Sequence, residues 1–328
     1  MIKAVRVHEY GGPEKLVYED IEIGEPGPGQ ALVRHTAIGL NFADIHNREG
    51  RYPLPSLPHV LGGEAAGIVE AVGAGVTDVA VGDRVAYAAG GPAFPPGSYA
   101  EKRLFDASRL VLLPEEIDDI TAAGLMTKGL TAQYLLKDCY RVARGDTIVV
   151  HAAAGGVGSI LCQWARHLGA RVIGVVGSKE KADDAAANGC HHVLLGSEDI
   201  ARRVRQLTAG EGVPVVYDSV GKDTFEASLH CLRPRGTLVS FGTASGPVPP
   251  FDLFLLNKLG SLSITSGAFA WFFRSRAELL MRANDLFDVV LRGAVKVPVK
   301  QKFRLSEAVE AHRMLEARKT RGASVLMP

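Results

Sequence analysis

Cysteine is scarce in this sequence, and the few cysteines stand far apart. The 328 residues contain four of them, Cys139, Cys162, Cys190 and Cys231, with no CxxC pair. This spacing argues against a disulfide framework and against a cysteine-rich zinc site, and it suits a reducing compartment. We therefore expect a cytoplasmic protein.

Net charge, long apolar runs and a secretion signal are also lacking. The 37 basic and 36 acidic side chains leave a formal charge of +1, which gives no reason to expect a nucleic-acid partner. No stretch reaches the roughly 18 apolar residues of a membrane span. Residues 1–7 lack the uninterrupted apolar core of a secretory signal. We therefore expect a globular enzyme with a small-molecule partner, without nucleic acid and without a membrane span.

The pattern of the chain changes near residue 120. Before that point, short apolar segments alternate with glycine-containing turns, which is typical of a small, mostly antiparallel β domain; these segments are residues 31–38, 66–72 and 83–87. After it, apolar strands alternate with helical segments, as in a parallel βαβ array. The expected strands are residues 147–151, 171–176, 213–218 and 236–241, with helices over 157–168 and 179–187. A helix over 306–316 and a strand over 323–326 would return the chain to the first domain.

Residues 151–158 carry the strongest local signal, His-Ala-Ala-Ala-Gly-Gly-Val-Gly. They follow an expected strand and open an expected helix, which is the context that a dinucleotide-binding turn requires. Small residues let the backbone approach a pyrophosphate, and the helix N-terminus supplies amide donors. The motif therefore predicts cofactor contacts at Gly155, Gly156, Val157 and Gly158; the alternative is a plain βα turn.

The end of the next strand indicates which dinucleotide is bound. An NAD site usually places Asp or Glu there to bind the ribose 2′-hydroxyl, but this strand ends in Gly177 and Ser178. Ser178 could donate a hydrogen bond, and Lys179 or Lys181 could pair with a 2′-phosphate. We therefore predict NADPH. The alternative is that both lysines form a solvated first helical turn.

Two further strands are expected to end near the same cofactor. Residues 215–221 and 236–242 are apolar runs that finish in small or polar residues, among them Ser219. Ligands bind at the carboxyl edge of a parallel sheet. These strand ends are therefore candidates for the cofactor site.

Several segments together resemble the quinone oxidoreductases, the zeta-crystallin-like branch of the medium-chain dehydrogenases. They are residues 39–44, 50–53, 63–69, 128–132, 151–165 and 216–220. Because they occur in the family's order, the resemblance covers almost the whole chain. It implies an α/β protein with a doubly wound Rossmann domain over 125–267 and a GroES-like, mostly β catalytic domain over 1–124, completed by a return segment over 268–328. It also implies NADPH between the domains and a homodimer that pairs edge strands near residues 261–266, since an exposed edge strand invites such pairing.

The resemblance also predicts that the protein binds no metal. By resemblance, the positions that hold catalytic zinc in the alcohol dehydrogenases correspond to Asn41, Gly63 and Gly124 here. None of these residues is a plausible zinc ligand. The structural-zinc loop is missing as well, because residues 88–101 contain no cysteine.

A quinone is already an electron-poor acceptor, so its reduction needs no Lewis acid. The protein has only to hold the quinone against the nicotinamide, hydrogen-bond its oxygen and let water deliver the proton. The resemblance assigns these hydrogen bonds to Asn41 and Tyr52; the alternatives are a turn-stabilising Asn41 and a packing Tyr52. Asp44 is expected to support the site instead of acting as a base.

The resemblance implies further cofactor contacts outside the glycine-rich turn. They are Phe42, His46, Thr131, Tyr134, Phe241, Gly242, Thr243 and Arg318. A solvated helix end explains Arg318 almost as well. Gly196 stands where relatives carry an aromatic residue near the adenine.

Two other functions fit parts of this pattern. An NADPH-dependent 2-enoyl or other α,β-unsaturated carbonyl reductase would use the same cofactor geometry, and Tyr52 fits either reaction. A non-catalytic NADPH-binding protein is a third reading, which the absence of a basic run disfavours for RNA binding. Rates of NADPH oxidation with 1,4-benzoquinone and with crotonyl-type substrates separate the two reductases.

Because the family resemblance favours Lys181 over Lys179 as the 2′-phosphate contact, we predict that Lys181→Ala weakens NADPH binding selectively. A charge-assisted contact to the 2′-phosphate contributes about 1.5–3 kcal/mol, so its loss corresponds to roughly 10- to 150-fold in affinity. The KM for NADPH should rise accordingly, while NADH binding and kcat change little. Steady-state kinetics with both cofactors check this, and equal weakening of the two cofactors would contradict the role given to residues 177–181.

Overall fold

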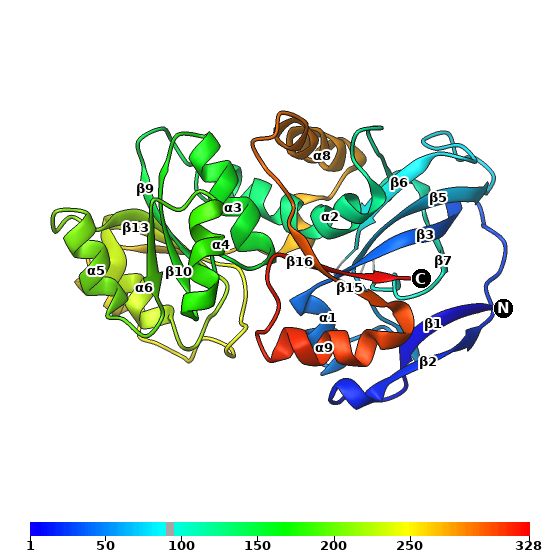
Figure 1. Ribbon diagram of the computed structural model, residues 1–328, viewed down its shortest axis with the longest axis horizontal. Helices are drawn as coiled ribbons and strands as arrows, with labels where there is room; N and C mark the ends of the chain where they lie inside the picture. The colour runs from blue at the N-terminus through cyan, green and yellow to red at the C-terminus, as the bar shows by residue number, and fades with distance from the viewer. Residues whose placement is uncertain (90–94) are drawn as a thin grey trace. The chain divides into compact units, whose positions relative to one another are not determined.

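The computed structural model describes residues 1–89 and 95–328, and the chain divides into two units (Figure 1). The β unit comprises Met1–Leu130, Phe272–Leu291 and Val297–Pro328, so both chain termini belong to it. The α/β unit comprises Thr131–Trp271 and Arg292–Lys296. Residues 90–94, within the segment that lacks cysteine, lie outside the described residues.

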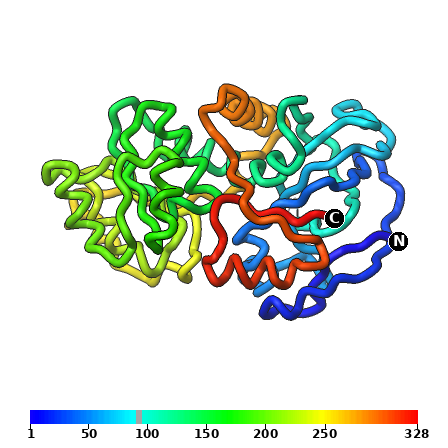
Figure 2. Tube along the Cα trace, in the orientation of Figure 1, coloured from blue at the N-terminus to red at the C-terminus, as the bar shows by residue number. Residues whose placement is uncertain are grey.

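The β unit is built on a seven-stranded sheet and a three-stranded sheet. The larger sheet has the order β15-β16-β3-β5-β6-β8, with β7 also paired to β3, and the smaller has the order β2-β1-β4. Its strands are β1 Ile2–Val7, β2 Leu16–Ile21, β3 Gln30–Leu40, β4 His59–Val60, β5 Glu64–Val72, β6 Arg84–Ala88, β7 Lys102–Asp106, β8 Val111–Leu112, β15 Val299–Arg304 and β16 Ala323–Met327. The C-terminal strand β16 pairs antiparallel with β3, so segments from near the two ends of the chain lie side by side in this sheet (Figure 2).

The core of the β unit follows from alternation along β3. Ala31 and Val33 are buried between less buried neighbours, and they join a cluster with Tyr87 and Tyr99. Alternate strand residues point to the same face, so a half-apolar strand buries one face of its sheet. The helices of this unit are α1 Phe42–Arg48, α2 Asp119–Tyr134, which ends in the α/β unit, α8 Arg276–Leu291 and α9 Ala308–Glu316. Short 3₁₀ turns cover Pro13–Lys15, Ala107–Arg109 and Leu305–Glu307, and a further one, Phe269–Phe272, begins in the α/β unit.

The α/β unit contains a six-stranded parallel sheet of order β11-β10-β9-β12-β13-β14. The order reverses between β9 and β12, which is the doubly wound arrangement that places ligands at the reversal point. The strands are β9 Thr147–His151, β10 Arg171–Val176, β11 His192–Leu195, β12 Val213–Asp218, β13 Leu232–Ser240 and β14 Ser263–Ser266. The helices are α3 Gly156–His167, α4 Ala182–Ala187, α5 Ile200–Leu207, α6 Phe225–Cys231 and α7 Phe254–Lys258, with a π-helical turn over Leu135–Cys139.

Right-handed crossovers place α3 and α4 on one face of this sheet and α5 and α6 on the other. In agreement, α3 and α4 both contact β10, while α5 and α6 contact each other. The core between these layers contains the buried side chains of Val149, Ile173, Val216 and Leu238. None of the helices in the described part of the chain has the length and apolar character that a membrane crossing requires.

The fold class predicted from the sequence is confirmed, and three of its strands end where expected: Thr147–His151, Arg171–Val176 and Val213–Asp218. The other predicted elements differ in their bounds, three of them clearly. The helix expected over 306–316 begins as the 3₁₀ turn Leu305–Glu307 and is α-helical from Ala308. The helix expected over 179–187 begins as a 3₁₀ turn, Lys179–Lys181, and becomes α-helical only from Ala182. The strand expected from residue 236 begins at Leu232, because Leu232 already pairs with Val213 before a register irregularity.

Candidate active site

The glycine-rich turn connects β9 to the twelve-residue helix α3. Gly155 is its N-cap in extended conformation, and the backbone N–H of Gly155 donates to the Ala152 carbonyl at 2.8 Å. A Cβ at Gly158 would lie 2.2 Å from that carbonyl oxygen, so only glycine fits there. The first-turn N–H groups of a helix lack intrahelical partners and carry positive partial charge. Gly156, Val157 and Gly158 therefore form a site suited to an anionic phosphate.

The structure brings the other predicted cofactor segments of the α/β unit to the same edge of the sheet. Gly177 and Ser178 follow β10, Ser219 follows β12, and the run from Phe241 through Gly242 and Thr243 follows β13. Since β10, β9, β12 and β13 are consecutive neighbours in a parallel sheet, their carboxyl ends form one continuous edge.

The segment after β10 is open enough for a ligand. A Cβ at Gly177 would meet no atom within 4 Å, and Ser178 is the extended N-cap of the following 3₁₀ turn. Lys181, half-buried, is the last residue of that turn, and its backbone N–H donates to the Ser178 carbonyl. A lysine thus lies in the turn after β10, and Gly177 and Ser178 place no carboxylate at the end of the strand itself.

Thr131 and Tyr134 lie in the last turn of α2 and are nearly buried. A Cβ at Gly267 would lie 2.9 Å from Cε2 of Tyr134, so the ring packs against the backbone that follows β14.

Asn41 is held in the β unit by a buried ion pair. The Glu64 carboxylate accepts from Asn41 Nδ2 at 2.8 Å and from the Lys128 ammonium at 2.5 Å on Oε1, and from the Thr127 N–H at 2.5 Å on Oε2. Glu64 has no exposed surface, and Lys128 and Asn41 are buried beside it. Because a carboxylate only accepts, the amide nitrogen of Asn41 must face Glu64. One of the two amide N–H groups is therefore used, and within the described residues the second has no partner.

Asn41 was predicted either to hydrogen-bond the substrate or to stabilise a turn, and its contacts bear on both roles. Asn41 is indeed the N-cap of α1, and the Asp44 carboxylate accepts from its backbone N–H at 2.8 Å, closing a capping box. Asn41 therefore does stabilise the start of α1, through its backbone N–H. Its side-chain amide nitrogen donates to Glu64.

Phe42 and His46 on α1 and Tyr52, four residues after its end, form a row of three rings. The ring centroids of Phe42 and His46 are 5.5 Å apart, and those of His46 and Tyr52 are 5.0 Å apart, both edge-to-face. Burial, followed by the charge of Arg51, lowers the pKa of His46, so this imidazole is neutral at neutral pH. Tyr52 is 49% exposed, which leaves its hydroxyl accessible to a ligand.

A second buried network connects α1 to α9. The Tyr99 hydroxyl donates to Asp44 Oδ2 at 2.9 Å and lies 3.1 Å from His312 Nε2, while His312 Nδ1 lies 3.1 Å from an Arg48 nitrogen. Because Arg48 only donates, His312 carries its proton on Nε2 and is neutral. Burial, followed by the charge of Arg48, lowers the pKa of His312 to about 3. Arg48 also pairs with Glu316 at the end of α9.

Arg318 follows α9 with φ of 56°, a left-handed conformation that non-glycine residues rarely adopt. Its backbone N–H donates to the Leu315 carbonyl at 3.0 Å. The Lys319 N–H donates to the Met314 carbonyl at 3.0 Å, so this conformation closes the C-terminal cap of α9.

Sequence reasoning missed Glu64 and Lys128. A usable signal was present, because each is a single charge inside an otherwise apolar or small-residue segment, residues 63–69 and 122–132. A charge in such a segment is seldom buried unless it is paired. What the sequence did not show is that the two charges pair with each other beside Asn41.

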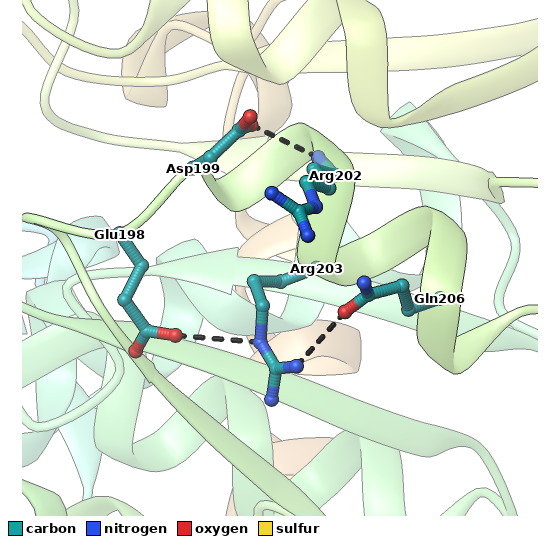
Figure 3. Close-up of a pocket in the computed structure, with 5 residues that line it drawn as sticks. All are labelled: Glu198, Asp199, Arg202, Arg203 and Gln206. Atoms are coloured by element: carbon teal, nitrogen blue, oxygen red, sulfur yellow. Dashed lines mark hydrogen bonds and ion pairs between the residues drawn. The ribbon is translucent and has the colours of Figure 1, made fainter.

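A hollow on the surface of the α/β unit lies outside these groups (Figure 3). Arg203 contacts Glu198 at 3.3 Å and donates to Gln206 at 2.9 Å, and the Asp199 carboxylate caps α5 through the Arg202 N–H. Glu198 is therefore paired with Arg203, and Asp199 serves as a helix cap. The hollow contributes no further reactive group to the candidate site.

We predict that Asp44 makes folding less favourable as the pH rises from about 4 to about 7. Burial raises the pKa of Asp44 to about 7, against hydrogen bonds from Asn41 and Tyr99. The folded protein therefore keeps a proton that the unfolded chain releases near pH 4. Across this range Asp44→Asn should gain stability relative to the wild type, and above pH 7 the difference should stay constant.

Urea unfolding of both proteins at successive pH values measures this difference. Asp118→Asn is the matched control, because hydrogen bonds from Thr121 lower the pKa of Asp118 despite its burial. Its difference from the wild type should be flat above about pH 5. Parallel curves for Asp44→Asn and the wild type would contradict the prediction.

Comparisons with known proteins identify the family. The alcohol dehydrogenase GroES-like domain family matches residues 27–115, and the zinc-binding dehydrogenase family matches residues 156–281. The chain is 49% identical to the quinone oxidoreductase of Pseudomonas aeruginosa, covering 100% of both sequences. It is 46% identical to the 2-haloacrylate reductase of a Burkholderia species, covering 100% of this chain and 99% of that protein. The crystal structure of Escherichia coli quinone oxidoreductase complexed with NADPH matches with a TM-score of 0.96 at 43% identity, covering 99% of this chain and 100% of that one. The chain therefore belongs to the quinone oxidoreductase family of the medium-chain dehydrogenases and reductases.

Proposed function

We propose that the protein transfers reducing equivalents from NADPH to a quinone without a metal. The observation that carries this proposal is the buried Asn41–Glu64–Lys128 group, which presents an oriented amide donor instead of a metal site. The relatives named quinone oxidoreductase and the NADPH in the Escherichia coli structure support the same reading.

The residues of the α/β unit fit the proposed cofactor. The N-terminal amides of α3 would hold the pyrophosphate, and Ser178 and Lys181 would hold the 2′-phosphate. The remaining proposed contacts are Phe42, His46, Thr131, Tyr134, Gly177, Ser219, Phe241, Gly242, Thr243 and Arg318. When bound, NADPH supplies the hydride.

The residues beside Asn41 do not fit zinc, although one matched family is named for it. The Asn41 amide nitrogen faces Glu64, Gly63 has no side chain, and the Lys128 ammonium already occupies the Glu64 carboxylate. A cation would be repelled by that ammonium. Among the residues that the structure describes, no three His, Cys, Asp or Glu side chains gather as a metal site.

In the proposed reaction the second amide N–H of Asn41 donates to a quinone oxygen and orients the ring. The exposed hydroxyl of Tyr52 donates a further hydrogen bond, and water delivers the proton to the reduced oxygen. The Glu64–Lys128 pair keeps the amide from rotating, because a flipped amide would set its oxygen against the carboxylate.

A second candidate is reduction of an activated alkene. The 46% identity to 2-haloacrylate reductase favours it, since a haloacrylate is an α,β-unsaturated acid. The same donors could bind a carbonyl or carboxylate oxygen. Rates of NADPH oxidation with 1,4-benzoquinone, a crotonyl thioester and 2-chloroacrylate rank the two, and faster turnover of the alkenes would favour the second candidate.

We also propose a cytoplasmic homodimer. The four cysteines are free thiols, which supports a reducing compartment. β14, the last strand in the order of the parallel sheet, offers an edge for pairing across a two-fold axis.

We expect Asn41→Ala to lower kcat/KM for the quinone by about 10- to 150-fold, the effect of losing one hydrogen bond to a developing charge. The Kd for NADPH should not change. Asn257→Ala, at an exposed amide of α7, is the control and should leave both values unaltered. An unchanged kcat/KM in Asn41→Ala would contradict the proposal.

Activity should also persist in a strong chelator. One zinc ion per chain in a metal analysis would contradict a reaction without metal.

The dimer is tested by sedimentation. We expect a species of twice the chain mass across a wide concentration range. A monomer at every concentration would refute pairing through β14.

A further inference from the structure

Two buried side chains stand where β9 and β12 end. His151 is the last residue of β9 and Asp218 the last of β12, and the two strands are paired through Val150 and Tyr217. Both side chains are almost completely buried. They therefore lie beneath the carboxyl edge of the sheet, where the proposed cofactor segments begin.

The Asp218 carboxylate is fully used as an acceptor. Oδ1 accepts from the N–H groups of Val220 at 2.8 Å and Gly221 at 3.2 Å, and from the Thr224 hydroxyl at 2.9 Å. Oδ2 lies 2.7 Å from the same hydroxyl and accepts from the Ser228 hydroxyl at 2.8 Å. One carboxylate thus closes the turn after β12 and attaches it to α6.

Ser228 connects Asp218 to His151. Its oxygen lies 3.0 Å from His151 Nε2, and it has a single proton, which goes to the carboxylate. His151 must therefore donate from Nε2. Hydrogen bonds are thus donated from the imidazole to the hydroxyl and from the hydroxyl to the carboxylate, so no base activates the serine as a nucleophile. Ser228 also has no exposed surface and cannot contact a substrate. We call Asp218, Ser228, His151 and Thr224 the Asp218 cluster.

The turn that Asp218 closes holds the next cofactor segment in place. The Ala244 and Ser245 N–H groups donate to the carbonyls of Ser219 at 3.2 Å and Val220 at 2.8 Å. A Cβ at Gly242 would lie 2.8 Å from the Ser219 carbonyl oxygen. The loop after β13 is thus packed directly on the turn after β12.

His151 attaches the same cluster to the glycine-rich turn. The next residue, Ala152, has φ of 51°, a conformation that persists only where its surroundings impose it. The Ala152 carbonyl is the atom that Gly155 donates to and that Gly158 approaches. Fixing His151 therefore fixes the start of that turn.

We propose that Asp218, Ser228 and His151 are positioning residues for NADPH, setting the relative placement of three cofactor segments: the glycine-rich turn, Ser219, and the loop beginning at Phe241. The inference rests on the proposed function, because it takes those segments to be the cofactor site. None of the three side chains touches the cofactor; they act through the backbone they hold.

The test is direct titration of NADPH into the purified full chain, with kinetics measured alongside. Ser228→Ala should raise the NADPH Kd by about 5- to 30-fold, less than the roughly 10- to 150-fold of a lost direct contact, because Ser228 acts on NADPH only through the backbone. At saturating NADPH, kcat and the KM for the quinone should change less than about twofold. His151→Gln keeps an N–H donor toward Ser228 and should bind NADPH nearly as the wild type does, whereas His151→Leu should weaken it as Ser228→Ala does.

Thr208→Ala is the matched control. Its hydroxyl donates to the Val204 carbonyl at 2.8 Å and accepts from the Gly212 N–H at 2.9 Å, just before β12 starts. It anchors the amino end of the strand whose carboxyl end Asp218 anchors, so its loss should lower stability without changing the NADPH Kd.

Several outcomes overturn the inference: an unchanged Kd in Ser228→Ala, equal weakening in Thr208→Ala, or equal weakening in His151→Gln and His151→Leu. If Ser228→Ala does not fold, the difference in NADPH Kd between His151→Gln and His151→Leu tests the inference instead. Binding is measured without a quinone. A wild type that binds NADPH but reduces no quinone therefore contradicts the proposed function, while the variant Kd values still judge the inference.

Discussion

A carboxylate taken out of water must be surrounded by donors, and this constraint shapes both units. Glu64 in the β unit receives the Lys128 ammonium, the Asn41 amide and a backbone N–H. Asp218 in the α/β unit receives two hydroxyls and two backbone N–H groups. An uncompensated buried charge costs several kcal/mol, on the order of the whole stability of a domain. The donors around each carboxylate are therefore fixed in direction as well as in distance.

That fixed direction is what a hydride-transfer site requires from its protein. The chemistry belongs to the cofactor, and the protein contributes orientation and hydrogen bonding. An amide free to flip would present its oxygen as readily as its nitrogen, but Asn41 cannot flip beside Glu64. Likewise, a glycine-rich turn placed without support could not hold Ala152 in a left-handed conformation. In both units the polar groups beneath the surface order the groups that we propose to contact the ligand.

The two buried histidines of these networks share a physical character. His312 accepts from Arg48, His151 lies beside Asp218, and burial lowers the pKa of both. Each is therefore neutral, with its proton on Nε2: Arg48 donates to Nδ1 of His312, and Ser228 accepts from Nε2 of His151. Neutral imidazoles can link a network without adding charge to it, which explains their use where carboxylates are already buried.

The sequence alone determined the doubly wound sheet, because apolar strands, glycine-rich turns and helical spacing are local features. The ends of β9, β10 and β12 followed directly from such patterns, and so did the candidates on those strand ends. The extra length of β13 did not, because it depends on Leu232 meeting Val213. Nor did the partners of Asn41 and His151: Glu64 is 23 residues from Asn41, and Ser228 is 77 residues from His151. Only the tertiary structure decided which buried charge pairs with which donor, because that pairing is set by how distant strands and helices pack and not by any spacing along the chain.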